Sequence, residues 1–413
     1  MLLLHVDAVD NNQSPSTTGA TLKISNTLNI HRMSEIQKIT VLGSGIMGHG
    51  IAQISAMAGF EVALRDIKHE FLNNAMNKIK WSLNKLVEKK TLSQSECESI
   101  YNRIHPVIPL REALAGADLL IEAVPENMDL KRAVYKEVDE NSDASTIYAS
   151  NTSTLPISEI STLISRPKKF IGLHFFNPPQ LMKLVEVIPG TATDQGTINI
   201  GMDFIKKIGK EAILCRKDVP GFIVNRIFIP LVHEAAFCLD REGPTMSQLD
   251  SAVKFRLSFP MGIFELADYT GIDVIHKATF EMYARDKAVI FPHPKIKDLF
   301  DQGKYGKKSG SGFYSYGDGQ YERVSLSEEE ARGYDPIKLL AVALNNASWL
   351  ISNDVCSLAD LETALKLGMG LRNPLFDTAR QFGLKKIITT LEELRKKYGD
   401  FYKANNYLPS LLD

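Results

Sequence analysis

Short apolar runs and amphipathic segments alternate in the stretch KITVLGSGIMGHGIAQISAMAGFEVALRD, residues 38–66. The run KITVL is rich in apolar and β-branched residues, which favours a strand. Apolar residues then recur at the three- and four-residue spacing of a helix that ends at Gly59, and EVALR is a second strand-like run. This succession predicts a strand, a helix and a second strand.

Two further apolar runs extend this pattern. ADLLIEAVPEN, residues 117–127, and STIYASNTSTLPISEI, residues 145–160, each indicate a buried strand that leads into a polar turn. Strands that alternate with helices in this way form a doubly wound parallel sheet. The sequence therefore predicts a Rossmann-type α/β domain over residues 36–218.

The second half of the chain contains an internal repeat. QLDSAVKFRLSFPMGIFELADYTGID, residues 248–273, aligns without a gap with DLETALKLGMGLRNPLFDTARQFGLK, residues 360–385, at an offset of 112 (360 − 248 = 112). Leu249 then meets Leu361, and the shared apolar spacing is that of helices. This predicts an all-α region in two copies, with chance similarity of amphipathic helices as the alternative. The two copies are assigned to residues 219–320 and 330–413.

Three glycines of the first turn follow a spacing that is typical of dinucleotide-binding loops. Gly43 allows a tight turn, Gly45 lets the backbone approach a pyrophosphate, and Gly48 lets the helix pack closely on the strand. Asp66 ends the next strand, 23 residues after Gly43 (66 − 43 = 23). A carboxylate there accepts hydrogen bonds from ribose hydroxyls and repels a 2′-phosphate. The pattern predicts NAD rather than NADP as cofactor, with a solvated turn residue as the other interpretation of Asp66.

Polar residues after the next two strands are expected at the same edge of the sheet, because parallel strands bring their carboxyl ends together. Asn151 and Ser153 are expected near the nicotinamide, whereas helix capping is the preferred interpretation of Ser150, Thr152 and Thr154. The residues predicted to contact the cofactor are Gly43, Gly45, Ile46, Met47, Gly48, Asp66, Glu122, Asn127, Asn151 and Ser153.

A glutamate inside an apolar strand is the most unusual feature of LHFFNPPQLMKLVEV, residues 173–187. Glu186 lies between Val185 and Val187, where an unpaired charge would be costly. His174 precedes it by 12 residues (186 − 174 = 12), a spacing that suits two short strands joined by the turn NPPQ. The two residues are predicted to form a pair that is either catalytic or structural.

Length and composition limit the class of protein. A chain of 413 residues exceeds one ordinary core, which predicts two or three domains. The formal net charge of −1 provides no basic surface for nucleic acid or a membrane. The four cysteines and the histidines lack metal-ligand spacing, so no metal site is predicted. We expect a cytoplasmic protein, with residues 1–32 a disordered extension or an upstream translation start.

Six segments taken in chain order resemble the 3-hydroxyacyl-CoA dehydrogenase family. They are SNTSTL, GLHFFNPP, MKLVEV, DVPGFIVNR, FPMGIFELADYTGID and GKKSGSGFYSY, and the resemblance runs from about residue 39 to residue 316. It implies a Rossmann NAD domain, an all-helical second domain and an acyl-CoA substrate. The implied reaction oxidises (S)-3-hydroxyacyl-CoA to 3-oxoacyl-CoA, in fatty-acid β-oxidation or 3-hydroxybutyryl-CoA metabolism.

The resemblance also implies roles for residues whose motifs align. His174 would be the general base and Glu186 the carboxylate that orients it, while Asn177 would position its turn. The segment WSLNKLVEKK resembles a family segment that contacts the CoA phosphates, although a solvated amphipathic helix explains it equally well. The implied catalytic residues are His174, Glu186, Ser153 and Asn225. The implied substrate-binding residues are Ser82, Lys89, Asn177 and Asn225.

Two other functions fit the same residues. One is a related NAD-dependent dehydrogenase of a 3-hydroxy acid without CoA, and the other is a non-catalytic NAD-binding protein. Single-copy relatives are implied to dimerise through their helical domains. Two copies in one chain therefore predict an intramolecular pairing. Whether the whole chain also forms a homodimer is open at the level of sequence.

Overall fold

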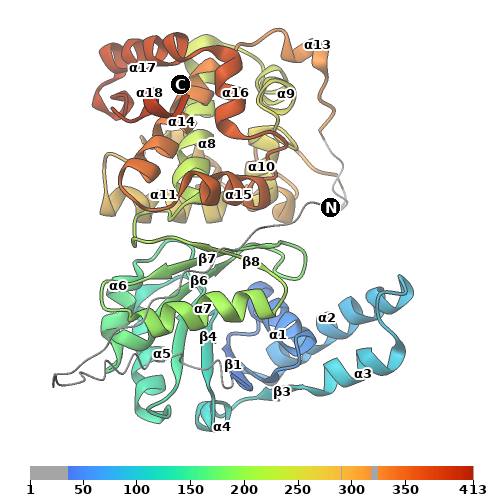
Figure 1. Cartoon of the computed structure of the whole chain (residues 1–413). Helices are drawn as coiled ribbons and strands as arrows, with labels where there is room; N and C mark the ends of the chain where they lie inside the picture. The colour runs from blue at the N-terminus through green and yellow to red at the C-terminus, as the bar shows by residue number, and fades with distance from the viewer. Residues whose placement is uncertain (1–35, 290, 318–323, 413) are drawn as a thin grey trace, which may run out of the picture.

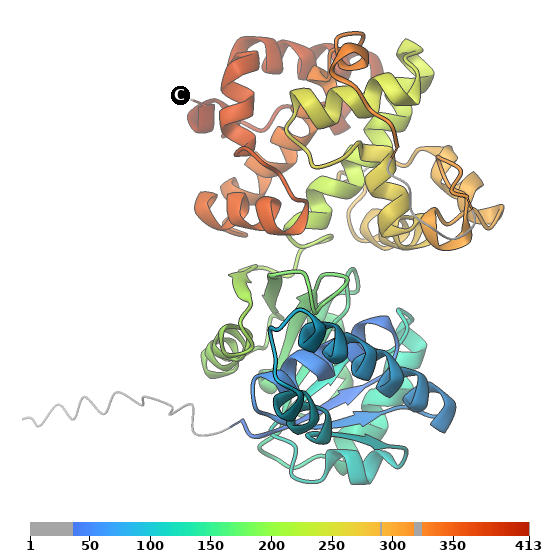
Figure 2. The same ribbon diagram turned by 90° about the vertical axis from the view of Figure 1, so that its right-hand side faces the viewer.

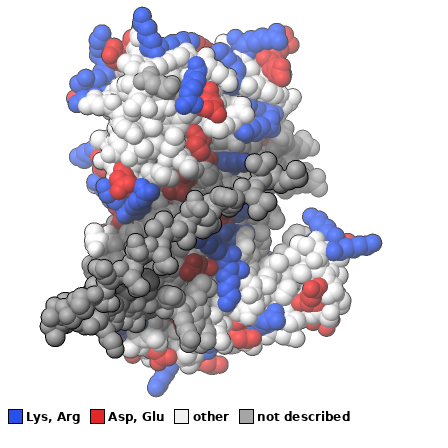
Figure 3. Space-filling view, in the orientation of Figure 1, with Lys and Arg blue, Asp and Glu red and all other residues white. Residues whose placement is uncertain are grey.

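The computed structural model describes residues 36–289, 291–317 and 324–412, which form two bodies stacked end to end (Figure 1). The first body is an α/β domain and the second consists of helices and loops. The predicted extension over residues 1–32 lies outside the described residues. Lys, Arg, Asp and Glu side chains occur on both bodies of the face drawn in Figure 3. Among the described helices, none has both the length and the apolar character that a membrane crossing requires.

An eight-stranded sheet forms the centre of the first body, in the order β3-β2-β1-β4-β5-β6-β7-β8. Neighbouring strands are parallel except β6 and β7, which are antiparallel. The first six strands keep the order of a doubly wound dinucleotide-binding sheet, which confirms the predicted α/β class. The strands are β1 (Lys38–Leu42), β2 (Glu61–Arg65), β3 (Ile104–Val107), β4 (Leu119–Glu122), β5 (Ile147–Ser150), β6 (Phe170–Phe175), β7 (Leu184–Pro189) and β8 (Glu211–Leu214).

Helices cover both faces of this sheet, because its strands bury side chains on both sides. Ile39 and Val41 pack in the cluster formed with α1, α2, α3 and α7, whereas Leu42 belongs to the cluster of α4, α5 and α6. These helices are α1 (Ile46–Met57), α2 (His69–Glu88), α3 (Gln94–Asn102), α4 (Leu110–Leu114), α5 (Met128–Asn141), α6 (Ile157–Ile160) and α7 (Gln195–Lys207). Two 3₁₀ turns follow α6, η1 (Ser161–Leu163) and η2 (Pro167–Lys169).

A long central helix, α8 (Val224–Glu242), organises the second body (Figures 1 and 2). It is buried along most of its length and packs against α14. The cluster that covers the α5 face of the sheet continues through most of the helical body. The remaining helices are α9 (Met246–Arg256), α10 (Ile263–Thr270), α11 (Ile272–Arg285), α12 (Pro294–Asp301), η3 (Lys307–Ser309), α13 (Glu328–Ala331), α14 (Ile337–Ser352), α15 (Leu358–Gly368), α16 (Leu375–Phe382), α17 (Leu384–Tyr398), η4 (Asp400–Tyr402) and α18 (Leu408–Leu412).

Candidate active site

His174 and Glu186 lie directly opposite each other on the antiparallel strands β6 and β7. The His174 Nδ1 atom is 2.6 Å from Glu186 Oε2, and both side chains are buried. The spacing of 12 residues thus corresponds to a strand pair that places imidazole beside carboxylate. Since Nδ1 faces Glu186, Nε2 is the ring nitrogen available for proton transfer.

The second oxygen of Glu186 joins the sheet to the helical body. Glu186 Oε1 accepts hydrogen bonds from the backbone N–H groups of Ile223 and Val224, at 3.1 and 2.9 Å. These groups lie at the N-terminal end of α8, where the helix dipole favours a negative charge. Three hydrogen bonds therefore compensate the burial of this carboxylate.

Two aromatic rings bound the His174 side chain. The ring centroid of Phe176 lies 4.6 Å from that of His174, and the centroid of Phe222 lies 5.7 Å away. Phe222 is fully buried and has a positive φ of 52°, a conformation that non-glycine residues seldom adopt. The two rings restrict the imidazole to an orientation facing Glu186.

Ser153 and Asn225 come together across the junction of the two bodies. Asn225 Nδ2 donates to the backbone carbonyl of Ser153 at 3.3 Å, so the first turn of α8 contacts the loop that follows β5. In the same loop, Asn151 Oδ1 accepts from the backbone N–H of Phe175 at 2.9 Å. This contact ties the loop to the end of β6, next to His174.

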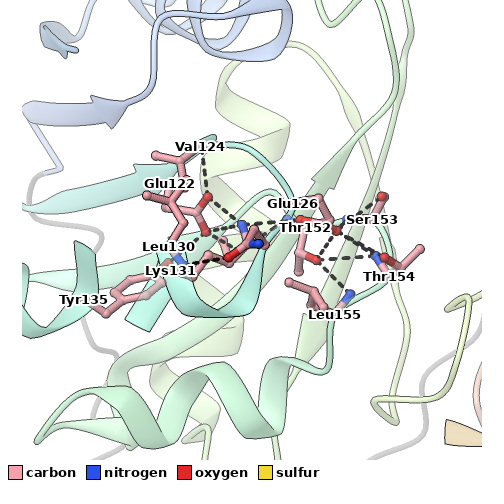
Figure 4. A network of polar contacts seen from close by, with 12 residues as sticks. Glu122, Val124, Glu126, Leu130, Lys131, Tyr135, Thr152, Ser153, Thr154 and Leu155 are labelled. Atoms are coloured by element: carbon pink, nitrogen blue, oxygen red, sulfur yellow. Dashed lines mark hydrogen bonds and ion pairs between the residues drawn. The ribbon is translucent and has the colours of Figure 1, made fainter. Parts of the chain in front are cut away.

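An ion-pair network that is largely buried supports that loop (Figure 4). Lys131 of α5 is 1% exposed and donates to both oxygens of Glu122, at 2.6 and 2.7 Å. Its ammonium also lies 3.4 Å from Glu126. Glu126 Oε1 in turn accepts from the backbone N–H of Ser153 at 2.9 Å. The network transmits the position of α5 to the loop that carries Ser153.

The sequence predicts that Glu122 contacts the cofactor, but the structure places its carboxylate inside the sheet. The residue is fully buried, and its carboxylate is bound by Lys131, Ser150, Tyr135 and the backbone N–H of Val124. No oxygen is left to face a ligand, so Glu122 supports the site from inside the sheet. Sequence reasoning missed Lys131, because a lysine in an otherwise polar helix is normally solvated.

The ionisation of this network follows from its partners. Burial alone would raise the pKa of Glu126, but Lys131 and the hydrogen bonds from Thr152, Ser153 and Thr154 outweigh it and lower the pKa. Burial alone would lower the pKa of Lys131, but Glu122 and Glu126 outweigh it and raise the pKa. Opposite charges are thus favoured in both partners.

The glycine-rich loop has the geometry that a dinucleotide requires. Gly43 has a φ of +91°, and a Cβ atom on Gly48 would lie 1.7 Å from the Gly43 carbonyl oxygen. A Cβ atom on Gly45 would meet nothing within 4 Å, which leaves open space beside the loop where a pyrophosphate can approach. Asp66 Oδ2 accepts from the backbone N–H and the hydroxyl of Ser44, both at 2.7 Å, so it also fixes the loop.

Other predicted ligands lie at different places in the fold. Ser82 is connected to the turn after His174 through Gln53, which donates to Ser82 Oγ at 3.0 Å and accepts from Gln180 at 3.4 Å. Lys89 is exposed at the C-terminal end of α2, farther along the same helix. Ile46 is 61% exposed at the start of α1, and Met47 follows it. Asn127 caps α5 by accepting from the backbone N–H of Leu130, and Asn177 is exposed before a cis proline.

No group of three His, Cys, Asp or Glu side chains in the described part of the chain is placed to hold a metal ion. The site consists of three parts: a glycine-rich loop at the start of α1, an acid at the end of β2, and a buried histidine–carboxylate pair. All three lie towards the carboxyl edge of the parallel strands. This arrangement defines the class of NAD-dependent dehydrogenases.

Comparison with known proteins identifies the family. The 3-hydroxyacyl-CoA dehydrogenase NAD binding domain matches residues 38–219, and the C-terminal domain of the same family matches residues 221–316. A probable 3-hydroxyacyl-CoA dehydrogenase of Caenorhabditis elegans is 37% identical over 310 residues, which cover 73% of this chain and 99% of that protein. The chain belongs to the 3-hydroxyacyl-CoA dehydrogenase family, and its first body is the NAD-binding domain of that family.

Two further relatives extend the comparison. A probable 3-hydroxybutyryl-CoA dehydrogenase of Bacillus subtilis is 39% identical over 289 residues, or 68% of this chain and 98% of that protein. The crystal structure of 3-hydroxybutyryl-CoA dehydrogenase from Escherichia coli has a TM-score of 0.82 and 27% identity. That similarity covers 92% of this chain and 98% of the other, so it extends well past residue 316.

We predict that Asp66→Asn narrows the preference for NAD over NADP. The amide keeps an acceptor for Ser44 but removes the charge that repels a 2′-phosphate. The ratio of kcat/KM for NAD to that for NADP should fall by roughly tenfold, equal to about 1.4 kcal/mol. Steady-state kinetics with both nucleotides provide the measurement. Equal use of the two nucleotides by the unmutated enzyme would contradict the assignment of Asp66.

We also predict that Lys131→Met lowers the free energy of unfolding by about 3 kcal/mol at pH 7, because the buried carboxylate of Glu122 and the partly exposed one of Glu126 would lose their cation. The difference in unfolding free energy between the variant and the unmutated chain should shrink as the pH falls below 4.5, the ordinary pKa of glutamate. The lowered pKa of Glu126 stabilises the unmutated fold fully above pH 4.5, and this stabilisation is lost as the carboxylate becomes protonated. Urea denaturation at several pH values tests this.

The neighbouring variant Arg132→Met is the control for Lys131→Met. Arg132 forms an exposed ion pair with Asp129, so its loss should cost less than about 1 kcal/mol. If the two variants lost the same free energy of unfolding, the buried ion pairs of Lys131 would stabilise the fold no more than an exposed ion pair does.

Proposed function

We propose that the chain oxidises (S)-3-hydroxyacyl-CoA to 3-oxoacyl-CoA, with His174 as general base and Glu186 as the residue that orients it. The observation that carries this proposal is the 2.6 Å contact between the two side chains at the carboxyl edge of the NAD-binding sheet. The acyl-CoA substrate is proposed from the similarity to the C. elegans, B. subtilis and E. coli proteins, which are named as dehydrogenases of 3-hydroxyacyl-CoA or 3-hydroxybutyryl-CoA.

Side chains of the protein remove the proton of the substrate hydroxyl and contact the substrate oxygens. His174 Nε2 accepts the proton of the substrate hydroxyl, and the Glu186 carboxylate stabilises the imidazolium that forms. Ile223 and Val224 keep this carboxylate in place through their N–H groups. When bound, NAD would accept the hydride from the carbon that bears this hydroxyl group.

Ser153 and Asn225 are proposed to face the oxygens of the substrate. Their side chains come from the loop after β5 and from the first turn of α8, which meet through the hydrogen bond between Asn225 and the Ser153 carbonyl. Donors held in fixed positions stabilise the developing carbonyl without reorganising during the reaction. Ser82 and Lys89 remain candidates for contacts with the CoA phosphates.

An absorbance assay for NADH separates this proposal from the two alternatives. We expect the purified chain to consume NADH with acetoacetyl-CoA and to be far slower with free acetoacetate. Faster turnover of the free acid would favour a dehydrogenase of non-CoA acids. Binding of NAD without turnover of either compound would favour a non-catalytic NAD-binding protein.

We predict that His174→Gln loses roughly 100-fold or more in kcat but keeps its affinity for NAD, because a general base contributes on this scale. His105→Gln is the matched control, since His105 is an exposed residue of β3 that pairs with Glu61. A variant at His174 that turns over at a normal rate would refute the mechanism.

Glu186→Gln should lower kcat with little change in the dissociation constant of NAD. The amide oxygen can still accept from Ile223 and Val224, so the helix should stay in place while the charge that stabilises the imidazolium is lost. Single-turnover kinetics and NAD titration measure the two quantities. An unchanged kcat would remove Glu186 from the mechanism.

We further propose that the helical body contains two copies of one unit, with residues 330–413 as the degenerate copy. α9 and α15 begin 112 residues apart and end 112 residues apart (358 − 246 and 368 − 256). α10 and α16 keep the same offset at both ends. α11 and α17 also begin 112 residues apart, and each follows a glycine with positive φ, Gly271 at 108° and Gly383 at 87°.

Equivalent carboxylates cap equivalent helices in the two copies. Asp250 accepts from the backbone N–H groups of Phe264 and Glu265 at the start of α10. Glu362, which is 112 residues later, accepts from the backbone N–H groups of Leu375 and Phe376 at the start of α16. A carboxylate that caps the same helix at the same position supports common descent of the two units more strongly than shared apolar spacing alone.

The contacts between the copies have the reciprocity of a twofold axis. Ser258 accepts a hydrogen bond from the backbone N–H of Arg372 at 2.9 Å, and Pro260 lies against Gly370. With the offset of 112, Ser258 is equivalent to Gly370 and Pro260 to Arg372. Each contact is therefore the counterpart of the other, as in an isologous interface.

We predict that a chain ending at Tyr316 associates or aggregates. Without residues beyond 316, α8 loses α14 and exposes the apolar side chains that pack there, a patch of the kind that drives association. Light scattering of the truncated and full-length chains is the measurement. A truncated chain that stays monomeric, soluble and equally stable would contradict the proposed role of the second copy.

A further inference from the structure

The second copy reaches the catalytic site through the C-terminal end of α15. This helix contacts β7 and β8 at the edge of the NAD-binding sheet. Beside it, Arg216 forms an ion pair with Asp354 at 2.6 Å, and the Lys217 ammonium donates to the Asn353 carbonyl at 2.5 Å. The second copy is thus fastened to the NAD-binding domain as well as to the first copy.

Gly368, the last residue of α15, lies against three residues near the proposed dyad. A Cβ atom on Gly368 would lie 3.0 Å from Leu184 Cδ2, 3.0 Å from Val224 Cγ2 and 3.4 Å from Phe176 Cε1. The first two distances are shorter than most carbon–carbon contacts in proteins. A side chain at this position would therefore displace its neighbours.

Each of these three neighbours bears on the proposed dyad. The Phe176 ring lies 4.6 Å from the His174 ring. The Val224 backbone N–H donates to Glu186 at 2.9 Å, and Leu184 begins the strand that carries Glu186. A side chain at Gly368 that displaced these neighbours would therefore also displace His174 and Glu186.

A second contact holds the same turn of α8. The Arg226 guanidinium carbon lies 3.3 Å from the ring centroid of Trp349, which belongs to α14 in the second copy. Gly368 therefore rests on Val224 and Trp349 rests on Arg226, on either side of Asn225. The helix turn that presents Asn225 is clamped by the second copy at both neighbours.

We propose that Gly368 is a positioning residue for the dehydrogenase reaction, because its missing side chain lets the second copy close on Phe176 and Val224 without displacing His174 and Glu186. This inference rests on the proposed function and extends it. At the position equivalent to Asn225 the second copy has Ile337 (225 + 112 = 337), but this copy forms part of the wall behind the proposed base.

The test compares Gly368→Ala and Gly368→Val with the unmutated enzyme. We expect Gly368→Val to lower kcat by roughly 10- to 100-fold, the scale of a small misplacement of a catalytic group. Gly368→Ala should show a smaller loss in the same direction. The dissociation constant of NAD should change by less than about threefold, because the glycine-rich loop is untouched.

Gly333→Ala is the matched control for crowding. A Cβ atom on Gly333 would lie 2.9 Å from Gln248 Nε2, at the α13 end of the helical body, away from the sheet (Figure 1). This variant should alter the melting temperature without lowering kcat. A second comparison adds Leu184→Val to Gly368→Val, because Leu184 Cδ2 would lie 3.0 Å from a Cβ atom on Gly368. The smaller side chain gives room for the valine, so the double variant should turn over faster than Gly368→Val alone.

The outcomes separate this inference from the proposed function. If the unmutated chain does not act on acetoacetyl-CoA, the proposed function fails and this inference fails with it. If the unmutated chain is active but Gly368→Val keeps a kcat within twofold of it, only this inference is overturned. A double variant no faster than Gly368→Val alone also overturns it. Should Gly368→Val not fold, Gly368→Ala measured against Gly333→Ala decides by the same criteria.

Discussion

The buried carboxylate of Glu186 is the group on which the rest of the site depends. One oxygen contacts His174 and the other accepts from the N-terminal end of α8, so one charge orients the histidine and positions the helical body. A charge in an apolar strand is tolerated only when its hydrogen bonds are satisfied, which makes both contacts necessary to the fold. The direction of α8, and therefore the position of Asn225, follows from the residue that orients the proposed base.

The loop after β5 is held in a comparable way from the other side. Lys131 neutralises Glu122 inside the sheet and lies beside Glu126, whose oxygen binds the backbone of Ser153 (Figure 4). Charged groups without solvent keep their positions because any movement leaves an unpaired charge. Polar groups at the carboxyl edge are therefore fixed before a ligand arrives, which is the condition for electrostatic stabilisation of a transition state.

The helical body combines a proposed internal symmetry with a functional asymmetry. An isologous interface requires a surface that is complementary to itself, and the Ser258–Arg372 and Pro260–Gly370 contacts have that reciprocity. Under the proposed duplication, two units in one chain would avoid the loss of translational and rotational freedom that separate subunits bear on association. The second unit would then be free to differ from the first at positions facing the NAD-binding domain. Gly368, equivalent by the offset to Arg256, is one such position.

The sequence by itself determined the α/β domain, the helical region and the pairing of His174 with Glu186, because each depends on local periodicity or on the register of two adjacent strands. Local spacing also located the glycine-rich loop. Only the tertiary structure decided that Glu122 points inward to Lys131, that Ser153 meets Asn225, and that Gly368 approaches Phe176. These contacts join residues from different elements, and two of them join different bodies. Their side-chain directions follow from how helices pack on the sheet and on each other, which residue order along the chain does not specify.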